Sequence, residues 1–211
     1  MNLARAGERA RVKRFVFFSS VRAQIGPNAG KVVSEADEPQ PTDAYGRSKL
    51  AAEQALAELG IDWVALRPVL VFGRGAKGNF AALMRVARSP YPLPLRALHA
   101  RRSLLSVQNL TDAVETVLAH DGALRRPFLV ADDEPLTMSE IIQAMREGLG
   151  RRRRLFPVPA GLLKVALRLG GREDWIPRLT GSLVVDTSAI KRLGWAPRLA
   201  SKAALRDLMA E

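Results

Sequence analysis

The sequence predicts an α/β fold with a parallel sheet, and two observations lead to this class. Short apolar runs that suit buried strands alternate along the chain with longer segments of helical periodicity. These runs are nearly continuous in apolar residues, which is typical of parallel strands that helices cover on both faces. A sheet flanked by helices is therefore the expected architecture.

The predicted elements follow from local signals. The predicted strands are apolar runs bounded by turn-forming or polar residues, at 15–18, 61–66, 102–107, 127–131 and 183–185. The predicted helices carry apolar residues at helical spacing, at 2–13, 42–59, 80–88, 111–120, 139–149, 162–169 and 187–193. Thr42 or Asp43 can cap the second of these helices, and Gly60 can end it in the left-handed conformation. Thr137 or Ser139 can begin the helix at 139–149.

The remaining segments are predicted to be loops and turns. A loop with several glycines and prolines spans 21–41, and a glycine-rich turn spans 73–78. The segment 91–95 contains prolines and is expected to be extended, whereas 162–169 is amphipathic.

The composition limits the function classes. The chain has 211 residues, two histidines and no cysteine, so we expect no disulfide, no metal site and no cysteine nucleophile. No apolar run is long enough to span a membrane and no secretory signal is present, so a cytoplasmic location without a membrane partner is expected.

The net charge of +12 suggests an anionic ligand. Apart from the arginines at 151–154, the basic residues are scattered along the chain, and no spacing typical of a nucleic-acid-binding module occurs. Nucleic-acid binding is therefore disfavoured. An anionic small molecule accounts for the charge at least as well.

Tyr45 and Lys49 are the first candidate catalytic residues. They lie four residues apart at the start of the predicted helix 42–59, so both side chains project from one helical face. A phenol is normally a poor base at neutral pH, but a neighbouring ammonium favours the phenolate. The pair can thus act as a general acid/base toward a hydroxyl group.

Ser20 is the third candidate. It follows the strand at 15–18, and sites in parallel α/β sheets lie at the carboxyl ends of strands. The loop between Ser20 and Tyr45 can bring the two hydroxyl groups to the same substrate oxygen. The spacing Tyr-x-x-x-Lys is weak evidence alone, and the order of strand, serine, loop and helix strengthens it.

These motifs resemble those of the extended short-chain dehydrogenase/reductases, and within them the nucleoside-diphosphate-sugar epimerase/dehydratase group. The resemblance covers essentially the whole chain and rests on FVFFSS at 15–20, YGRSKLAAE at 45–53, LRPVLVFG at 66–73, KGNF at 77–80, RRSLLSV at 101–107, NLTDA at 109–113 and LGWAP at 193–197. It implies a partial Rossmann-type, doubly wound parallel sheet with a small C-terminal α/β substrate lobe.

The resemblance also implies roles for individual residues. Ser20, Tyr45 and Lys49 correspond to the catalytic residues, with Ser20 also contacting the substrate. Tyr45, Lys49 and Pro68 correspond to residues that contact NAD or NADP. Asn79 and Arg102 correspond to residues that contact the substrate diphosphate, although Asn79 can equally be a helix cap and Arg102 a strand-edge charge.

The implied reaction is the epimerisation of a nucleotide sugar, through C4 oxidation to a keto sugar and re-reduction. The implied division assigns 1–73 and 103–135 to the NAD-binding domain, and 74–102 and 136–211 to the sugar-nucleotide lobe. The family's Gly-x-x-Gly-x-x-Gly fingerprint is absent from the sequence, so an N-terminally truncated form is expected.

Several alternatives remain open. A 4-keto-sugar reductase or a dehydratase would use the same scaffold. A non-catalytic remnant could instead bind the nucleotide sugar and pair an exposed sheet edge with another polypeptide. The expected assembly is a homodimer or a pairing through that edge.

Overall fold

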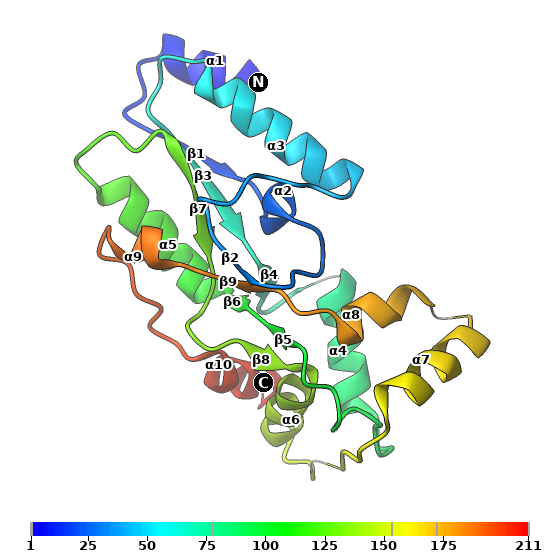
Figure 1. The fold of residues 1–211 in the computed structure, drawn as a ribbon. Helices are drawn as coiled ribbons and strands as arrows, with labels where there is room; N and C mark the ends of the chain where they lie inside the picture. Colours follow the sequence, from blue (N-terminus) through cyan, green and yellow to red (C-terminus); the bar gives the residue numbers. More distant parts are fainter. Residues whose placement is uncertain (1, 77, 153, 172, 211) are drawn as a thin grey trace.

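The central feature of the computed structural model, which describes residues 2–76, 78–152, 154–171 and 173–210, is a parallel three-stranded sheet. Its order is β1 (Phe15–Phe18), β3 (Trp63–Pro68) and β7 (Arg126–Val130) (Figure 1). Within the described residues β1 pairs with β3 alone, in a register that places Phe15 opposite Trp63. β1 therefore forms one edge of this sheet.

Helices cover both faces of the sheet because successive side chains of a strand point to opposite sides. On one face, Trp63 and Ala65 of β3 pack in a cluster with residues of α1 (Asn2–Arg9) and α3 (Ala44–Ala57). On the other face, Val64 and Leu66 pack with residues of α5 (Val107–Ala119) and α9 (Ser188–Lys191) in a larger cluster, the first apolar cluster. Figure 1 shows these two pairs of helices on opposite sides of the strands. The sheet is thus doubly wound.

Three two-stranded pairs extend the structure beyond this sheet. The parallel pairs are β2 (Val32–Val33) with β9 (Val184–Val185), and β4 (Leu70–Phe72) with β6 (Leu104–Ser106). The antiparallel pair is β5 (Arg101–Arg102) with β8 (Leu136–Thr137).

A second apolar cluster lies next to these short strands. It gathers side chains from α4 (Gly78–Arg88), α6 (Met138–Gly148), α7 (Ala160–Leu169), α8 (Ile176–Thr180) and α10 (Ser201–Ala210). The short helices α2 (Val21–Gln24) and η1 (Glu173–Trp175) complete the fold. After β3 the chain passes from the first apolar cluster to the second, because Val69 packs in the first and Phe72 in the second.

Most predicted elements form, and the differences have local causes. The helix predicted from residue 111 begins at Val107, because the Ser106 side chain accepts a hydrogen bond from the Asn109 N–H and caps it. The strand predicted at 102–107 is interrupted at Ser103. The helix predicted at 139–149 begins after Thr137, which forms a capping box with Glu140.

Several elements were not predicted from the sequence. The loop expected at 21–41 contains α2 and β2, the C-terminal residues form α10, and β4, β8, η1 and α8 also form outside the predicted ranges. Apart from the ten-residue α10, these elements have two to five residues, too few to show a periodicity, so tertiary contacts decide them. In the described part of the chain, no helix has the length and apolar character needed to cross a bilayer.

Candidate active site

Lys49 and Tyr45 lie together at the carboxyl end of β1. The Lys49 Nζ donates a hydrogen bond of 2.8 Å to the carbonyl oxygen of Phe18, the last residue of that strand. The same Nζ lies 5.7 Å from the centroid of the Tyr45 ring and 4.8 Å from that of Phe17. The Tyr45 side chain is 54% exposed. The ammonium is therefore fixed beside a phenol that an incoming molecule can reach.

The start of α3 is held by a cap and a close helix contact. Asp43 caps the helix by accepting a 2.6 Å hydrogen bond from the Gly46 N–H, and it forms an ion pair with Arg22 of α2. The Gly46 N–H and the Arg22 guanidinium keep the pKa of Asp43 below its ordinary value, although burial opposes them. A Cβ at Gly46 would lie 2.2 Å from the Arg22 carbonyl oxygen, so only glycine allows this approach.

Ser20 lies at the N-terminus of α2, directly after β1. Its Oγ accepts a 3.2 Å hydrogen bond from the Arg22 N–H and so caps the short helix. This contact uses a lone pair of the oxygen, so the hydroxyl proton can be donated to another acceptor. The side chain is half-buried.

A cleft of about 580 Å³ opens beside Ser20. Ser20, Arg22 and Asp43 line the side formed by α2 and the start of α3. Leu83, Met138, Trp175 and Leu179, all from the second apolar cluster, line the opposite side. The cleft therefore lies between the first and the second apolar clusters, at the carboxyl end of the sheet, where ligands bind in open α/β sheets.

The other predicted residues are divided between the cleft and its surroundings. Arg102 lines the cleft from β5, and burial lowers the pKa of its guanidinium. Pro68 ends β3 and is paired with Val130, next to the cleft-lining Val69. Asn79 lies in the first turn of α4, and its side chain lies outside the described residues. Tyr45 and Lys49 are not among the residues that line the cleft.

A buried polar cluster behind the candidate site was not predicted from the sequence. Arg67 donates from Nε to Glu53 Oε1 at 3.0 Å and from its terminal nitrogen to Oε2 at 2.5 Å, and these side chains are 4% and 5% exposed. Arg67 also donates to Gln24, and the Ser19 hydroxyl donates to Glu53. The cluster thus ties the end of β1, α2, α3 and β3 together. Glu53 lies four residues after Lys49, a spacing that could have suggested it.

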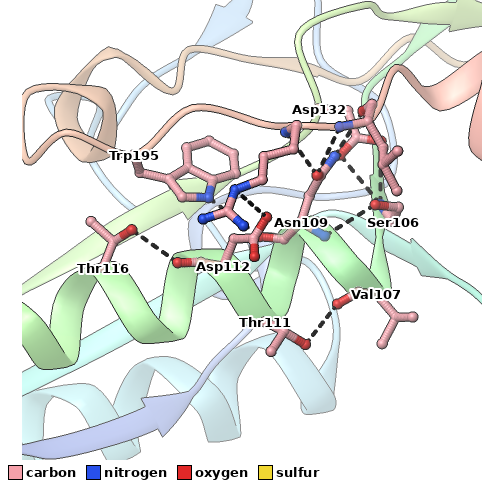
Figure 2. Close-up of polar contacts among 10 residues, drawn as sticks. Ser106, Val107, Asn109, Thr111, Asp112, Thr116, Asp132 and Trp195 are labelled. Carbon is pink, nitrogen blue, oxygen red and sulfur yellow. Dashed lines mark hydrogen bonds and ion pairs between the residues drawn. The ribbon is translucent and has the colours of Figure 1, made fainter.

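A second buried network lies on the other side of the sheet (Figure 2). The Asp132 carboxylate follows β7 and accepts hydrogen bonds from Asn109 Nδ2 at 2.8 Å and from the Ser201 hydroxyl at 2.6 Å. The Ser106 N–H also donates to it, at 3.2 Å. Burial raises the pKa of Asp132, although these hydrogen bonds oppose the rise. The network joins α5, β7 and α10, and none of these residues lines the cleft.

Comparison with known proteins adds a family match. The model of the family described as NAD dependent epimerase/dehydratase matches residues 1–133. The UDP-glucose 4-epimerase of Vibrio cholerae is 37% identical over 204 residues, which cover 93% of this chain and 62% of that protein. A 3 beta-hydroxysteroid dehydrogenase/Delta 5→4-isomerase of Mycobacterium tuberculosis is 32% identical, over 72% of this chain and 44% of that protein.

A solved structure shares the fold. The UDP-glucose 4-epimerase of Thermotoga maritima with UDP-glucose superposes with a TM-score of 0.72 at 20% sequence identity, covering 98% of this chain and 65% of that one. The chain therefore spans less than two thirds of the length of each of these three proteins.

Proposed function

The chain belongs to the NAD dependent epimerase/dehydratase family, and from this premise we propose that it acts in the NAD(P)-dependent epimerisation of a nucleotide sugar. The reaction would oxidise a sugar hydroxyl, at C4, to a ketone and reduce it again. One observation carries the proposal: Lys49 donates a hydrogen bond to the Phe18 carbonyl at the end of β1, and its ammonium lies beside the accessible Tyr45 ring.

Tyr45 is proposed as the general acid/base. An ammonium beside a phenol generally favours negative charge on the phenol oxygen, and Tyr45 would accept the proton of the sugar hydroxyl and later return it. Because the Phe18 carbonyl occupies one of the three N–H donors of Lys49, the other two can reach a ligand. Ser20 is proposed to donate its hydroxyl proton to the same sugar oxygen and so orient it.

The chain carries residues for one end of the nicotinamide cofactor. When bound, this cofactor supplies the hydride acceptor and donor for the reaction. Tyr45 and Lys49 present a hydroxyl and an ammonium that suit the ribose next to the nicotinamide, and Pro68 would pack near the ring. The glycine fingerprint that holds the pyrophosphate does not occur in the 211 residues, so the fit is limited to this end.

Arg102 is proposed to bind the substrate diphosphate in the cleft. A guanidinium can donate two parallel hydrogen bonds to phosphate oxygens, and a half-buried position strengthens that attraction. Arg22, whose buried Nε has no hydrogen-bond partner among the described residues, faces the same cleft. Asn79 is proposed as a further substrate contact, because it corresponds to a substrate-binding residue in the family that the sequence resembles.

We propose a division of labour that follows the two sides of the cleft. Residues 1–73 and 103–135 would contact the cofactor, and residues 74–102 and 136–211 would bind the nucleotide sugar. Residues Ala189, Ile190 and Trp195 of the second part nevertheless pack in the first apolar cluster, which would fix the two parts against each other. Assembly as a homodimer, or through the free edge of β1, belongs to the same proposal.

A second candidate is one-way oxidation or reduction of a secondary alcohol. The Mycobacterium tuberculosis relative favours it, because that protein is a dehydrogenase of a hydroxysteroid. The same Tyr45, Lys49 and Ser20 would serve a 4-keto-sugar reductase. These activities differ from epimerisation because the keto compound is released as a product or supplied as a substrate, whereas an epimerase forms it and reduces it again.

The test combines binding with turnover. NAD and UDP-glucose are titrated separately into the chain by calorimetry, and conversion of UDP-glucose to UDP-galactose is followed with NAD present. Tyr45→Phe is expected to lower the rate about 100-fold or more, because it removes the acid/base group. Tyr91→Phe is the matched control, since Tyr91 is the other tyrosine and is 72% exposed.

Three outcomes would contradict the proposal. Full activity of Tyr45→Phe would exclude the acid/base role. Binding of UDP-glucose without binding of NAD would exclude catalysis by these 211 residues and favour a binding protein. Accumulation of a keto product, or turnover of a hydroxysteroid in place of UDP-glucose, would support the second candidate.

A further inference from the structure

Helix α7 has an apolar stripe on its outer face. On the inner face, Leu163 is buried and Leu167 packs against the second apolar cluster. On the outer face, Leu162 is 63% exposed, Val165 50% and Leu169 86%. The outer three lie at positions i, i+3 and i+7, so they form one continuous stripe along the helix. Figure 1 shows α7 at the periphery, away from the β1–β3–β7 sheet.

The segment that contains this stripe is basic in sequence. Between Glu147 and Glu173 the sequence has seven arginine and lysine residues and no acidic residue. Lys164 and Arg168 lie one turn apart on a flank of α7, and Arg168 is exposed. Phe156, four residues before α7 begins, is also 43% exposed.

The arginines before α7 are crowded together. Arg151, Arg152 and Arg154 line a cavity of about 350 Å³ with the buried Arg146, and all three are exposed. The Arg146 guanidinium donates to the carbonyl oxygens of Ser89 at 3.1 Å and Tyr91 at 2.9 Å. Burial and the charges of Arg151 and Arg154 lower the pKa of Arg146. A bound anion would relieve this repulsion between like charges.

We propose that residues 151, 152 and 154–169 form a surface that binds an anionic phospholipid bilayer. The exposed aliphatic side chains of α7 would enter the boundary between headgroups and acyl chains, and the arginines would bind lipid phosphates. α7 has ten residues, fewer than the roughly 20 that a membrane-spanning helix needs, so it would lie in the plane of the interface. The proposal does not depend on the identity of the sugar substrate.

Charge and shape favour a bilayer over other partners. A second copy would place the same basic segment against itself in a two-fold contact, and like charges would repel. A nucleic acid would satisfy the arginines and leave Leu162 and Leu169 in water. A bilayer is the partner that offers both an apolar interior and a negative surface to a helix whose side chains stand out from the protein.

Vesicle binding tests the proposal. The full chain is mixed with vesicles of phosphatidylcholine alone, or of phosphatidylcholine with phosphatidylglycerol, and the bound fraction is measured by flotation. We expect binding to the anionic vesicles, weaker binding to the neutral ones, and release by added salt. The Leu162→Ser/Leu169→Ser variant should partition about tenfold or more weakly, because two exposed leucines no longer enter the lipid. The Arg151→Gln/Arg152→Gln variant should lose the preference for the anionic vesicles.

A matched variant separates lipid insertion from loss of exposed apolar area in general. Leu3 and Leu118 are exposed leucines of α1 and α5, and Leu3→Ser/Leu118→Ser should bind vesicles as the wild type does. Equal loss in both double variants would overturn the proposal, as would absence of binding to anionic vesicles. A dimer that Leu162→Ser/Leu169→Ser dissociates would assign the stripe to a second copy. If inorganic phosphate displaced the chain from anionic vesicles as fully as competing vesicles do, the surface would be a phosphate site and not a lipid-binding surface.

Discussion

The two buried polar clusters each stabilise a carboxylate that is shielded from water, but they do so with different partners. Behind the candidate site, the Glu53 carboxylate is paired with the Arg67 guanidinium, so charge is compensated where water is excluded. On the other side of the sheet, the Asp132 carboxylate is held by Asn109, Ser201 and the Ser106 N–H, all of which are neutral. The first cluster depends on an opposite charge, and the second depends on hydrogen bonds alone.

The difference predicts how each cluster fails. Removing one member of a buried ion pair leaves an uncompensated charge in a medium of low polarity, which is strongly destabilising. Removing one neutral donor leaves the carboxylate with fewer hydrogen bonds, and the carboxylate can also take up a proton. The cluster behind the candidate site should therefore be the more sensitive to substitution, and the Asp132 network the more sensitive to pH.

The largest expected effect is that of Arg67→Met. It leaves Glu53 buried without its cation and should lower the free energy of unfolding by about 3–5 kcal/mol, measured by urea denaturation. The Arg67→Met/Glu53→Leu double variant should recover a large part of this loss, because no charge remains buried. Lys191→Met, which breaks the exposed Lys191–Asp133 pair, is the control and should cost less than about 1 kcal/mol. A loss for Arg67→Met no greater than that of the control would contradict the comparison.

An intermediate effect is expected for Asp132→Asn. The new amide can accept on one side only, so at least one donor of the network loses its partner, at about 1–3 kcal/mol. Asp112→Asn on the same helix as Asn109 is the control, because Asp112 faces the exposed Arg198 at 3.4 Å. Urea denaturation of both variants measures the difference. A cost above that of Arg67→Met would show that neutral hydrogen bonds matter more here than charge compensation.

The smallest expected effect is a pH dependence of opposite sign for two carboxylates. Burial raises the pKa of Asp132 above its ordinary value of 3.8, so its contribution to stability is fully present below that value and is lost as pH rises through the pKa of the folded state. Burial would also raise the pKa of Asp62, but the Leu124 N–H and the Arg14 guanidinium outweigh it and lower the pKa. The contribution of Asp62 is present above 3.8 and is lost as pH falls through its folded pKa.

Urea denaturation of the wild type, Asp132→Asn and Asp62→Asn from about pH 3 to about pH 6 measures both contributions. The stability difference between wild type and Asp132→Asn should shrink as pH rises. The stability difference between wild type and Asp62→Asn should grow as pH rises. If both stability differences changed with pH in the same direction, the Arg14 guanidinium would have no special role at Asp62.

The sequence by itself determined the order of the main strands and helices and the common helical face of the proposed acid/base pair. The apolar runs at 15–18 and 127–131 became β1 and β7 nearly without change, because buried parallel strands need continuous apolar residues. The four-residue spacing placed Tyr45 and Lys49 on one face of α3 before any tertiary contact was known.

The tertiary structure decided what surrounds that pair. The bond from Lys49 to the Phe18 carbonyl, the contact of Arg67 with Glu53 and the position of Ser20 in the cleft join residues that are 14 or more positions apart. Local patterns cannot predict such contacts, because they depend on how the elements pack. The helix start at Val107 likewise depended on the Ser106 cap.

Exposure is the property that the sequence determined least. The pattern of residues 162–169 predicts an amphipathic helix, and Leu162 and Leu163 are chemically identical neighbours. Only the packed structure shows that Leu163 faces the core and Leu162 faces water. The expectation of no membrane partner came from run length and composition, whereas the proposed lipid-binding surface rests on which face of α7 the core left uncovered. Composition sets how much apolar surface a chain has, and tertiary packing alone decides which part of it stays exposed.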